Sequence, residues 1–220
     1  MKKIIILICL VLTFSSCEIQ YDGETRIVVE GQLIDKDGNS LSNKKIEINA
    51  LGDGYIATDL ISYTNTDQNG KFSLAFPSPK TDNLLMISIN ENEKNELQYK
   101  QIIALKKNFK NYKLNLNQVI LYQETAITQL QLILKNTTTS KQLTDIKIEG
   151  LHANYYTDLN PIIATGNYTP PPQTVFDVLK NQNITLSYTV IDYSGSTAVI
   201  TKYNENITIN TEKVTHIITY

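Results

Sequence analysis

Apolar and polar residues alternate along most of the chain beyond residue 25, and this period of two predicts β-strands with one buried and one solvated face. No long helical period follows residue 17. Turn residues that tolerate positive φ separate the segments at Asp37-Gly38-Asn39 and Asp67-Gln68-Asn69-Gly70. In the first half we expect further strands at about 84–90, 98–105 and 112–122. The alternating apolar positions there are Ile27, Val29 and Leu33; Ile46, Ile48 and Ala50; Phe72, Leu74 and Phe76; Leu85, Ile87 and Ile89; and Leu114, Leu116 and Ile120.

The same alternation returns in the second half, where strands at nearly regular spacing predict a second sandwich, Ig-like in general form. Its apolar positions are Leu130, Leu132 and Leu134; Ile184, Leu186, Tyr188 and Val190; a short strand with Ile207 and Ile209; and Val214, His216 and Ile218 on one face. The stretch 151–173 is irregular and holds three consecutive prolines, which cannot lie in a central strand. The fold class is therefore all-β, with two tandem β-sandwiches at 25–122 and 124–220.

The N-terminus has a different pattern. Lys2 and Lys3 precede an apolar run from Ile4 to Phe14, and small residues then lead to Cys17. The run is far shorter than the roughly 20 residues of a membrane-spanning helix. This order resembles a bacterial lipoprotein signal peptide, which implies removal of residues 1–16 and acylation of Cys17, for example with palmitate. The polar residues 17–24 would then form a tether, and they also resemble the acidic stretches that send some Bacteroidetes lipoproteins to the cell surface.

The first half carries a family resemblance as well. The residues are Val29-x-Gly31-x-Leu33-x-Asp35-x-x-Gly38, then Leu41, then Ile46-x-Ile48, then Thr64-x-Thr66-Asp67-x-Asn69-Gly70-x-Phe72-x-Leu74. Together they resemble the carboxypeptidase regulatory-like domain. That resemblance implies a transthyretin-like, seven-stranded sandwich that serves as an accessory module without catalytic residues of its own. Ser40 and Asn43 depart from the family pattern, where Pro and Gly are frequent.

Charge and cysteine content exclude several functions. The formal charge of the 220 residues is −2, so the chain lacks the basic surface that nucleic-acid binding requires. Cys9 lies in the expected signal segment, which leaves Cys17 alone. A disulfide within the mature chain is therefore excluded, and so is a thiolate metal site. Five lysines gather at Lys100, Lys106, Lys107, Lys110 and Lys113, either as a solvated hairpin or as a contact for lipid head groups or an acidic polysaccharide.

The sequence predicts no catalytic residues, no metal site and no cofactor. The two histidines, His152 and His216, lie in separate segments outside any nucleophile motif. His216 falls on an apolar strand face, which favours a structural role. Asp35-x-Asp37-x-Asn39 begins like a calcium loop, but the sixth and twelfth positions are Ser40 and Ile46, so a polar turn explains it better.

Three tyrosines are the candidate ligand-binding residues. Tyr155, Tyr156 and Tyr168 occupy the irregular stretch and could stack on sugar rings or pack against a partner. Alternatively, they cover the open end of the sandwich.

These features favour a non-catalytic protein that is anchored in the outer membrane through lipidated Cys17, on the cell surface or the periplasmic face. Its function would be binding or assembly, with an envelope protein or a glycan as partner. Two alternatives stay open: a hydrolase with its site in the 151–173 loop, and a purely structural spacer.

Overall fold

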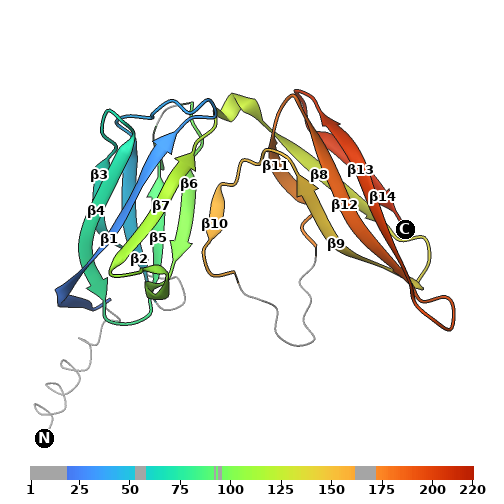
Figure 1. Ribbon diagram of the computed structural model, residues 1–220, viewed down its shortest axis with the longest axis horizontal. Coiled ribbons are helices and arrows are strands. Elements are labelled where there is room, and N and C mark those ends of the chain that lie inside the picture. The colour runs from blue at the N-terminus through green and yellow to red at the C-terminus, as the bar shows by residue number, and fades with distance from the viewer. Residues whose placement is uncertain (1–18, 53–57, 92, 94–95, 162–171) are drawn as a thin grey trace, which may run out of the picture. The chain divides into compact units, whose positions relative to one another are not determined.

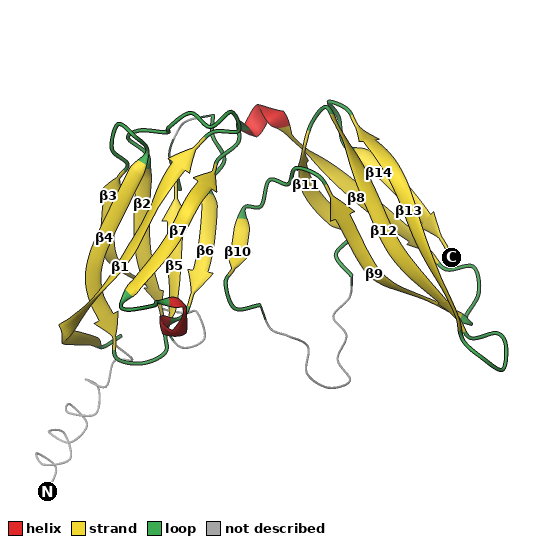
Figure 2. Ribbon diagram, in the orientation of Figure 1, coloured by secondary structure: helices red, strands yellow, loops and turns green. Residues whose placement is uncertain are grey.

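The computed structural model describes residues 19–52, 58–91, 93, 96–161 and 172–220, and its regular elements there are almost all β-strands (Figures 1 and 2). The helical elements of these residues are two single 3-10 turns, η2 (Lys106–Asn108) and η3 (Glu124–Ala126). The predicted all-β class is confirmed. Within the described residues, no helix is long and apolar enough to span a bilayer.

The chain divides into two compact units. The first contains the described residues up to Glu93 together with Tyr99–Ile120 and Tyr156–Asn160, and the second contains 96–98, Leu121–Tyr155 and Pro161–Tyr220. These units differ from the expected ranges 25–122 and 124–220, because residues 19–24 and 156–160 join the first unit and residues 96–98 and 121–122 join the second. Residues 96–98 belong to the second unit because their backbone bonds to residues 122–124, for example through Gln98 N–H and the Tyr122 carbonyl at 2.8 Å.

Two sheets build the first unit. One has the order β4-β1-β7 and the other the order β10-β6-β5-β2-β3. The strands of the first sheet are β1 (Tyr21–Ile34), β4 (Lys71–Pro79) and β7 (Lys113–Ile120). The strands of the second are β2 (Lys45–Leu51), β3 (Thr58–Asn65), β5 (Leu84–Ile89), β6 (Lys100–Ala104) and β10 (Tyr156–Asp158). β10 lies inside the stretch 151–173, which is therefore not wholly irregular.

The core of the first unit confirms the sequence pattern. The alternating side chains of β1, β2, β4 and β5 are almost fully buried. The expectation fails on β7, where Val119 is buried while Leu116 and Ile120 are half-buried, because a bulge in this strand breaks the alternation. Burial of an aliphatic or aromatic side chain of this size contributes about 1.5–3 kcal/mol. The most completely buried of these side chains are Ile27, Leu33, Ile46, Ile48, Phe76, Leu85, Ile87 and Ile89.

The second unit also has two sheets, with the orders β11-β8-β14 and β13-β12-β9. The first contains β8 (Ile127–Lys135), β11 (Val175–Leu179) and β14 (Val214–Thr219), and the second contains β9 (Lys141–Glu149), β12 (Gln182–Asp192) and β13 (Val199–Ile209). One apolar cluster joins the sheets, with Leu130, Leu132, Ile184, Leu186 and Ile218 at its centre. β13 has eleven residues and is therefore longer than the short strand predicted around Ile207 and Ile209.

The units repeat one pairing plan. Counted along the chain, β1–β7 and β8–β14 are two sets of seven strands, and in each set the first strand pairs antiparallel with the fourth and parallel with the seventh: β1 with β4 and β7, β8 with β11 and β14. The second strand also pairs antiparallel with the fifth, and the fifth with the sixth. The third strand differs, because β3 pairs with β2 whereas β10 pairs with β6 of the first unit. Among the described residues, no strand lies on the outer edge of β9, and its apolar side chains are only partly buried.

Candidate functional site

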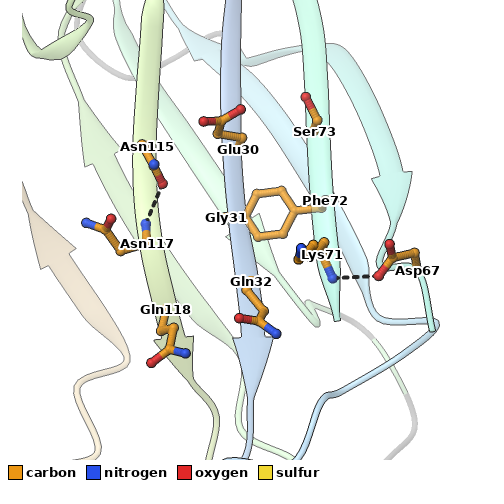
Figure 3. A pocket seen from close by; sticks show the side chains of 10 residues that line it. All are labelled: Glu30, Gly31, Gln32, Asp67, Lys71, Phe72, Ser73, Asn115, Asn117 and Gln118. Carbon is orange, nitrogen blue, oxygen red and sulfur yellow. Dashed lines mark hydrogen bonds between the residues drawn. The ribbon is translucent and has the colours of Figure 1, made fainter. Parts of the chain in front are cut away.

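A polar hollow of about 650 Å³ opens on the sheet β4-β1-β7 of the first unit (Figure 3). It lies over the sheet face that points away from the apolar core, because Glu30, Gln32, Lys71 and Ser73 alternate with buried positions along their strands. The volume falls within the range of small-ligand sites. The lining residues are Glu30, Gly31 and Gln32 from β1, Lys71, Phe72 and Ser73 from β4, Asn115, Asn117 and Gln118 from β7, and Asp67 from the turn before β4.

The floor of the hollow depends on Gly31. A Cβ atom at this position would lie 2.9 Å from Cζ of Phe72 and 3.3 Å from the carbonyl oxygen of Asn117. The Phe72 ring therefore occupies the space that a side chain at residue 31 would take, which is a common role of glycine inside a strand. Phe72 itself is buried, so the hollow has a rigid base.

A bulge in β7 shapes the opposite wall. Glu30 pairs with Asn115 and Gln32 with Gln118, so β7 carries one more residue than β1 over this interval. Asn117 takes up the extra length with a φ of 54°, and its N–H donates to Oδ1 of Asn115 at 2.8 Å (Figure 3). Bulges commonly redirect side chains, and this one brings consecutive amides to the rim.

Hydrogen bonds hold the polar walls in place. Gln32 Nε2 donates to the carbonyl of Asn69 at 2.9 Å, and the Lys71 N–H donates to Oδ1 of Asp67 at 2.8 Å. Glu30 pairs with Lys113 at 3.1 Å. Four of the ten lining residues carry side-chain amides, each with a donor and an acceptor, on strands whose positions the sheet fixes.

This arrangement suits recognition by hydrogen bonding. Glu30 is engaged with Lys113, and within the described residues no group of three or more His, Cys, Asp or Glu side chains could hold a metal ion. Sequence reasoning missed the hollow, because it joins strands that lie up to about ninety residues apart. Two features of the sequence could have indicated the hollow: Gly31 inside a strand pattern, and the amide residues Asn115, Asn117 and Gln118 close together.

The structure describes two of the three candidate tyrosines, Tyr155 and Tyr156, and assigns them to different units. Tyr155 belongs to the second unit, where its hydroxyl donates to Oε2 of Glu124 at 2.7 Å. Tyr156 belongs to the first unit, on β10, and is 58% exposed. Tyr168 lies outside the described residues. A shared tyrosine binding surface stays a prediction.

His216 has a structural setting, as its place on an apolar strand face predicts. Its Nε2 lies 2.7 Å from Oε2 of Glu205, whose Oε1 accepts the Tyr188 hydroxyl at 2.5 Å. The Tyr188 ring stacks on Tyr203 with centroids 5.0 Å apart. Burial raises the pKa of Tyr188, and the hydrogen bond to Glu205 adds to this effect. His152 is engaged through a backbone bridge with Val178.

The calcium-like segment is a polar turn. The Asp35 carboxylate accepts the N–H of Asp37 at 2.9 Å, the N–H of Asn39 at 2.8 Å and Nδ2 of Asn39 at 2.9 Å. The hydrogen bonds from Asn39 lower the pKa of Asp35. The Asp35 carboxylate therefore accepts hydrogen bonds from its own turn.

Cys17 lies outside the described residues. β1 begins at Tyr21, so residues 21–24, expected in the tether, lie in the strand. The Tyr21 hydroxyl donates to Asp59 at 2.6 Å, and the Lys80 N–H donates to the Gln20 carbonyl at 2.8 Å. The first unit is therefore ordered from within three residues of Cys17.

Comparison with known proteins gives no family. No protein-family model matches the chain, and no curated protein matches it. Among solved structures, the shaft pilin SpaA of Lactobacillus rhamnosus GG matches with a TM-score of 0.37 at 9% identity, over 89% of this chain and 98% of the pilin. A streptococcal ancillary pilin matches with 0.33 at 10% identity, over 89% and 63%.

An enzyme is among the similar structures too. The 3-chlorocatechol 1,2-dioxygenase of Rhodococcus opacus 1CP matches with a TM-score of 0.34 at 11% identity, over 49% of this chain and 62% of the enzyme. The chain spans less than two thirds of the length of several matched structures. Because every one of these TM-scores lies below 0.5, they establish neither a common fold nor a common function.

Proposed function

We propose that the protein is a lipid-anchored component of the bacterial cell envelope that binds a partner through the hollow on sheet β4-β1-β7. The observation that carries the proposal is the set of side-chain amides of Gln32 on β1 and of Asn115 and Gln118 on β7, close to Lys71 on β4. Such a surface can donate and accept hydrogen bonds along an extended ligand.

The ligand that suits this surface best is a polar, extended polypeptide segment of an envelope protein. Peptide groups offer one donor and one acceptor per residue, which matches the two-way capacity of amide side chains. An oligosaccharide is less well served, because the one aromatic ring of the lining, Phe72, is buried and cannot offer a face for stacking.

The N-terminal pattern supports the anchor. Lys2 and Lys3, the apolar run to Phe14 and the small residues before Cys17 match a lipoprotein signal. Several acyl chains on Cys17 would hold the protein stably in a bilayer, since each buried methylene contributes about 0.8 kcal/mol.

Metabolic labelling with an alkyne analogue of palmitate tests the anchor. We expect label on the wild-type protein in the membrane fraction and none on Cys17→Ser, which should remain unprocessed or leave that fraction. An unlabelled wild-type protein in the soluble fraction would refute the anchored location.

Site-specific photo-crosslinking in intact cells tests the hollow. A photoreactive residue in place of Asn115 should give a discrete protein adduct, and the same residue in place of Asn204, an exposed position on β13, should not. Adding Gln32→Ala and Gln118→Ala should remove the Asn115 adduct. If the adduct persisted in that variant, the hollow would not be the binding surface.

A further inference from the structure

One end of the first unit carries a group of unpaired lysines. This is the end at which β1 and β7 both begin, because the two strands run parallel (Figure 1). The segment between β6 and β7 contains η2 and a tight turn, and it exposes Lys106, Lys107 and Lys110. In the part of the chain that the structure describes, none of these three ammonium groups belongs to an ion pair.

The tight turn presents an aromatic side chain under backbone strain. Lys110 and Lys113 exchange two backbone hydrogen bonds, at 2.9 and 3.0 Å, around Asn111 and Tyr112. Asn111 has a φ of 50° and Tyr112 a φ of 64°, which is the two-residue hairpin turn that normally has glycine at its second position. A bulky residue with positive φ is a genuine outlier, and strained positions of this kind concentrate at functional sites.

The Tyr112 ring gains little from burial in return for this strain, since the residue is 65% exposed. Its carbonyl accepts the Val28 N–H at 2.9 Å, a bond that any residue type at this position could make. The side chain is therefore held outward beside three cationic groups. Tyrosine and lysine together are the residues that favour the boundary between water and lipid.

We propose that the lysine–tyrosine turn, formed by Lys106, Lys107, Lys110 and Tyr112, docks on anionic phospholipid head groups of the membrane that holds Cys17. The inference rests on the proposed lipid anchor. Because β1 begins at Tyr21, the chain between Cys17 and that strand reaches at most about 14 Å. This end of the unit therefore lies near the membrane surface, where the potential of anionic lipids extends over about a Debye length of roughly 8–10 Å.

Charge at the two ends of the unit agrees with this orientation. Asp22 and Glu24 offset part of the positive charge near the tether, and the Asp22 carboxylate is bonded to Thr25 Oγ1 at 2.5 Å. The opposite end has the turns with Asp35, Asp37 and Asp67, which follow the last residue of β1 or precede β4. Lys36, which pairs with Asp37 at 2.8 Å, and Lys71 lie in or beside the same turns, so the opposite end is mixed in charge and has no comparable group of lysines.

Vesicle binding of the non-acylated mature chain, residues 17–220 with Cys17→Ser, tests the proposal. We expect binding to vesicles that contain phosphatidylglycerol and none to pure phosphatidylcholine vesicles. Each lysine near an anionic surface contributes about fivefold in partitioning, so the triple variant Lys106→Gln, Lys107→Gln, Lys110→Gln should bind roughly a hundredfold more weakly. A matched triple at exposed lysines of the second unit, Lys135→Gln, Lys202→Gln and Lys213→Gln, should bind as the wild type does.

Tyr112→Gly tests what the aromatic ring contributes to membrane binding without destabilising the first unit. Glycine relieves the positive φ, so the first unit should be at least as stable while binding to phosphatidylglycerol weakens with an unchanged dependence on salt. Equal losses in the two lysine triples would overturn the proposal. Wild-type binding by Tyr112→Gly would also overturn it, as would retention on an acidic polysaccharide without binding to the vesicles.

Amine labelling of the acylated protein distinguishes this proposal from the anchor itself. In phosphatidylglycerol vesicles the three lysines should be protected from an amine-reactive reagent, and in phosphatidylcholine vesicles they should react. An acylated protein that reacts equally in both would refute the docking and leave the anchor intact. Absence of acylation in cells, with vesicle binding retained by the mature chain, would refute the anchor and leave the lipid affinity of the turn.

Discussion

Two glycines with positive φ provide a matched test of the first unit. Gly38 has a φ of 85° and Gly70 a φ of 71°, and each closes a turn by donating to an aspartate carbonyl three residues earlier. A Cβ on Gly38 would meet nothing within 4 Å, whereas a Cβ on Gly70 would lie 2.3 Å from the Leu33 carbonyl oxygen. Gly70→Ala should therefore destabilise the unit much more than Gly38→Ala.

The magnitude follows from two contributions. A left-handed backbone costs a non-glycine residue about 1–2 kcal/mol, and both variants incur that cost. Only Gly70→Ala must also move the backbone of Leu33, whose N–H donates to the Gly70 carbonyl at 2.7 Å. Losing that bond at a buried position adds about 1–3 kcal/mol. We expect a loss of roughly 1–2 kcal/mol for Gly38→Ala and roughly 2–5 kcal/mol for Gly70→Ala.

Urea unfolding followed by circular dichroism measures both losses. The transition of the first unit should shift to lower urea in the order wild type, Gly38→Ala, Gly70→Ala, with a common slope. Because the chain has two units, the transitions are fitted separately. Equal losses for the two variants would refute the steric reasoning, since the shared backbone cost would then explain everything.

Three further predictions concern the charged and polar groups. Burial raises the pKa of Tyr188 above its ordinary 10.0, so the unfolded chain loses this proton at a lower pH than the folded chain does, and stability should fall as the pH rises above about 10. Tyr188→Phe should reduce that fall in unfolding curves measured at alkaline pH. A fall of the same size in the variant would contradict this assignment to Tyr188. Burial lowers the pKa of Lys100, so Lys100→Met should raise the free energy of unfolding at neutral pH by up to about 1 kcal/mol, with a loss of stability as the contrary result. Lys113→Gln breaks a half-exposed pair with Glu30 and should change stability by less than about 1 kcal/mol, so a larger loss would mean that the pair supports the bulge in β7.

The strands with strict alternation could be predicted because every second residue on them is apolar, and these residues form the buried face. Ile46 and Ile48 on β2 and Ile184 and Leu186 on β12 are completely buried, as their spacing indicates. β9 was missed, because a register shift near Asp145, which has a φ of 53°, interrupts its alternation. The first half of β13 was missed as well, because it is exposed on both faces and carries polar residues.

The hollow and the lysine–tyrosine turn could be anticipated only in part. The lysines of 100–113 are visible as a cluster in the sequence, but the strain at Tyr112 and its place beside the first half of β1 depend on the pairing of β1 with β7. Local periodicity carries no information on which distant strands become neighbours. For the same reason the sequence could not reveal that β10 pairs with β6.

The parallel pairing of the first and last strands sets a condition on how each unit is synthesised. β8 (Ile127–Lys135) pairs with β14 (Val214–Thr219), which follows it only after all the other strands of the second unit. The ribosome must therefore have synthesised the chain through β14 before this sheet can close, and such distant contacts form slowly. A product without β14 would leave β8 with an open flank, and it should be prone to proteolysis and aggregation.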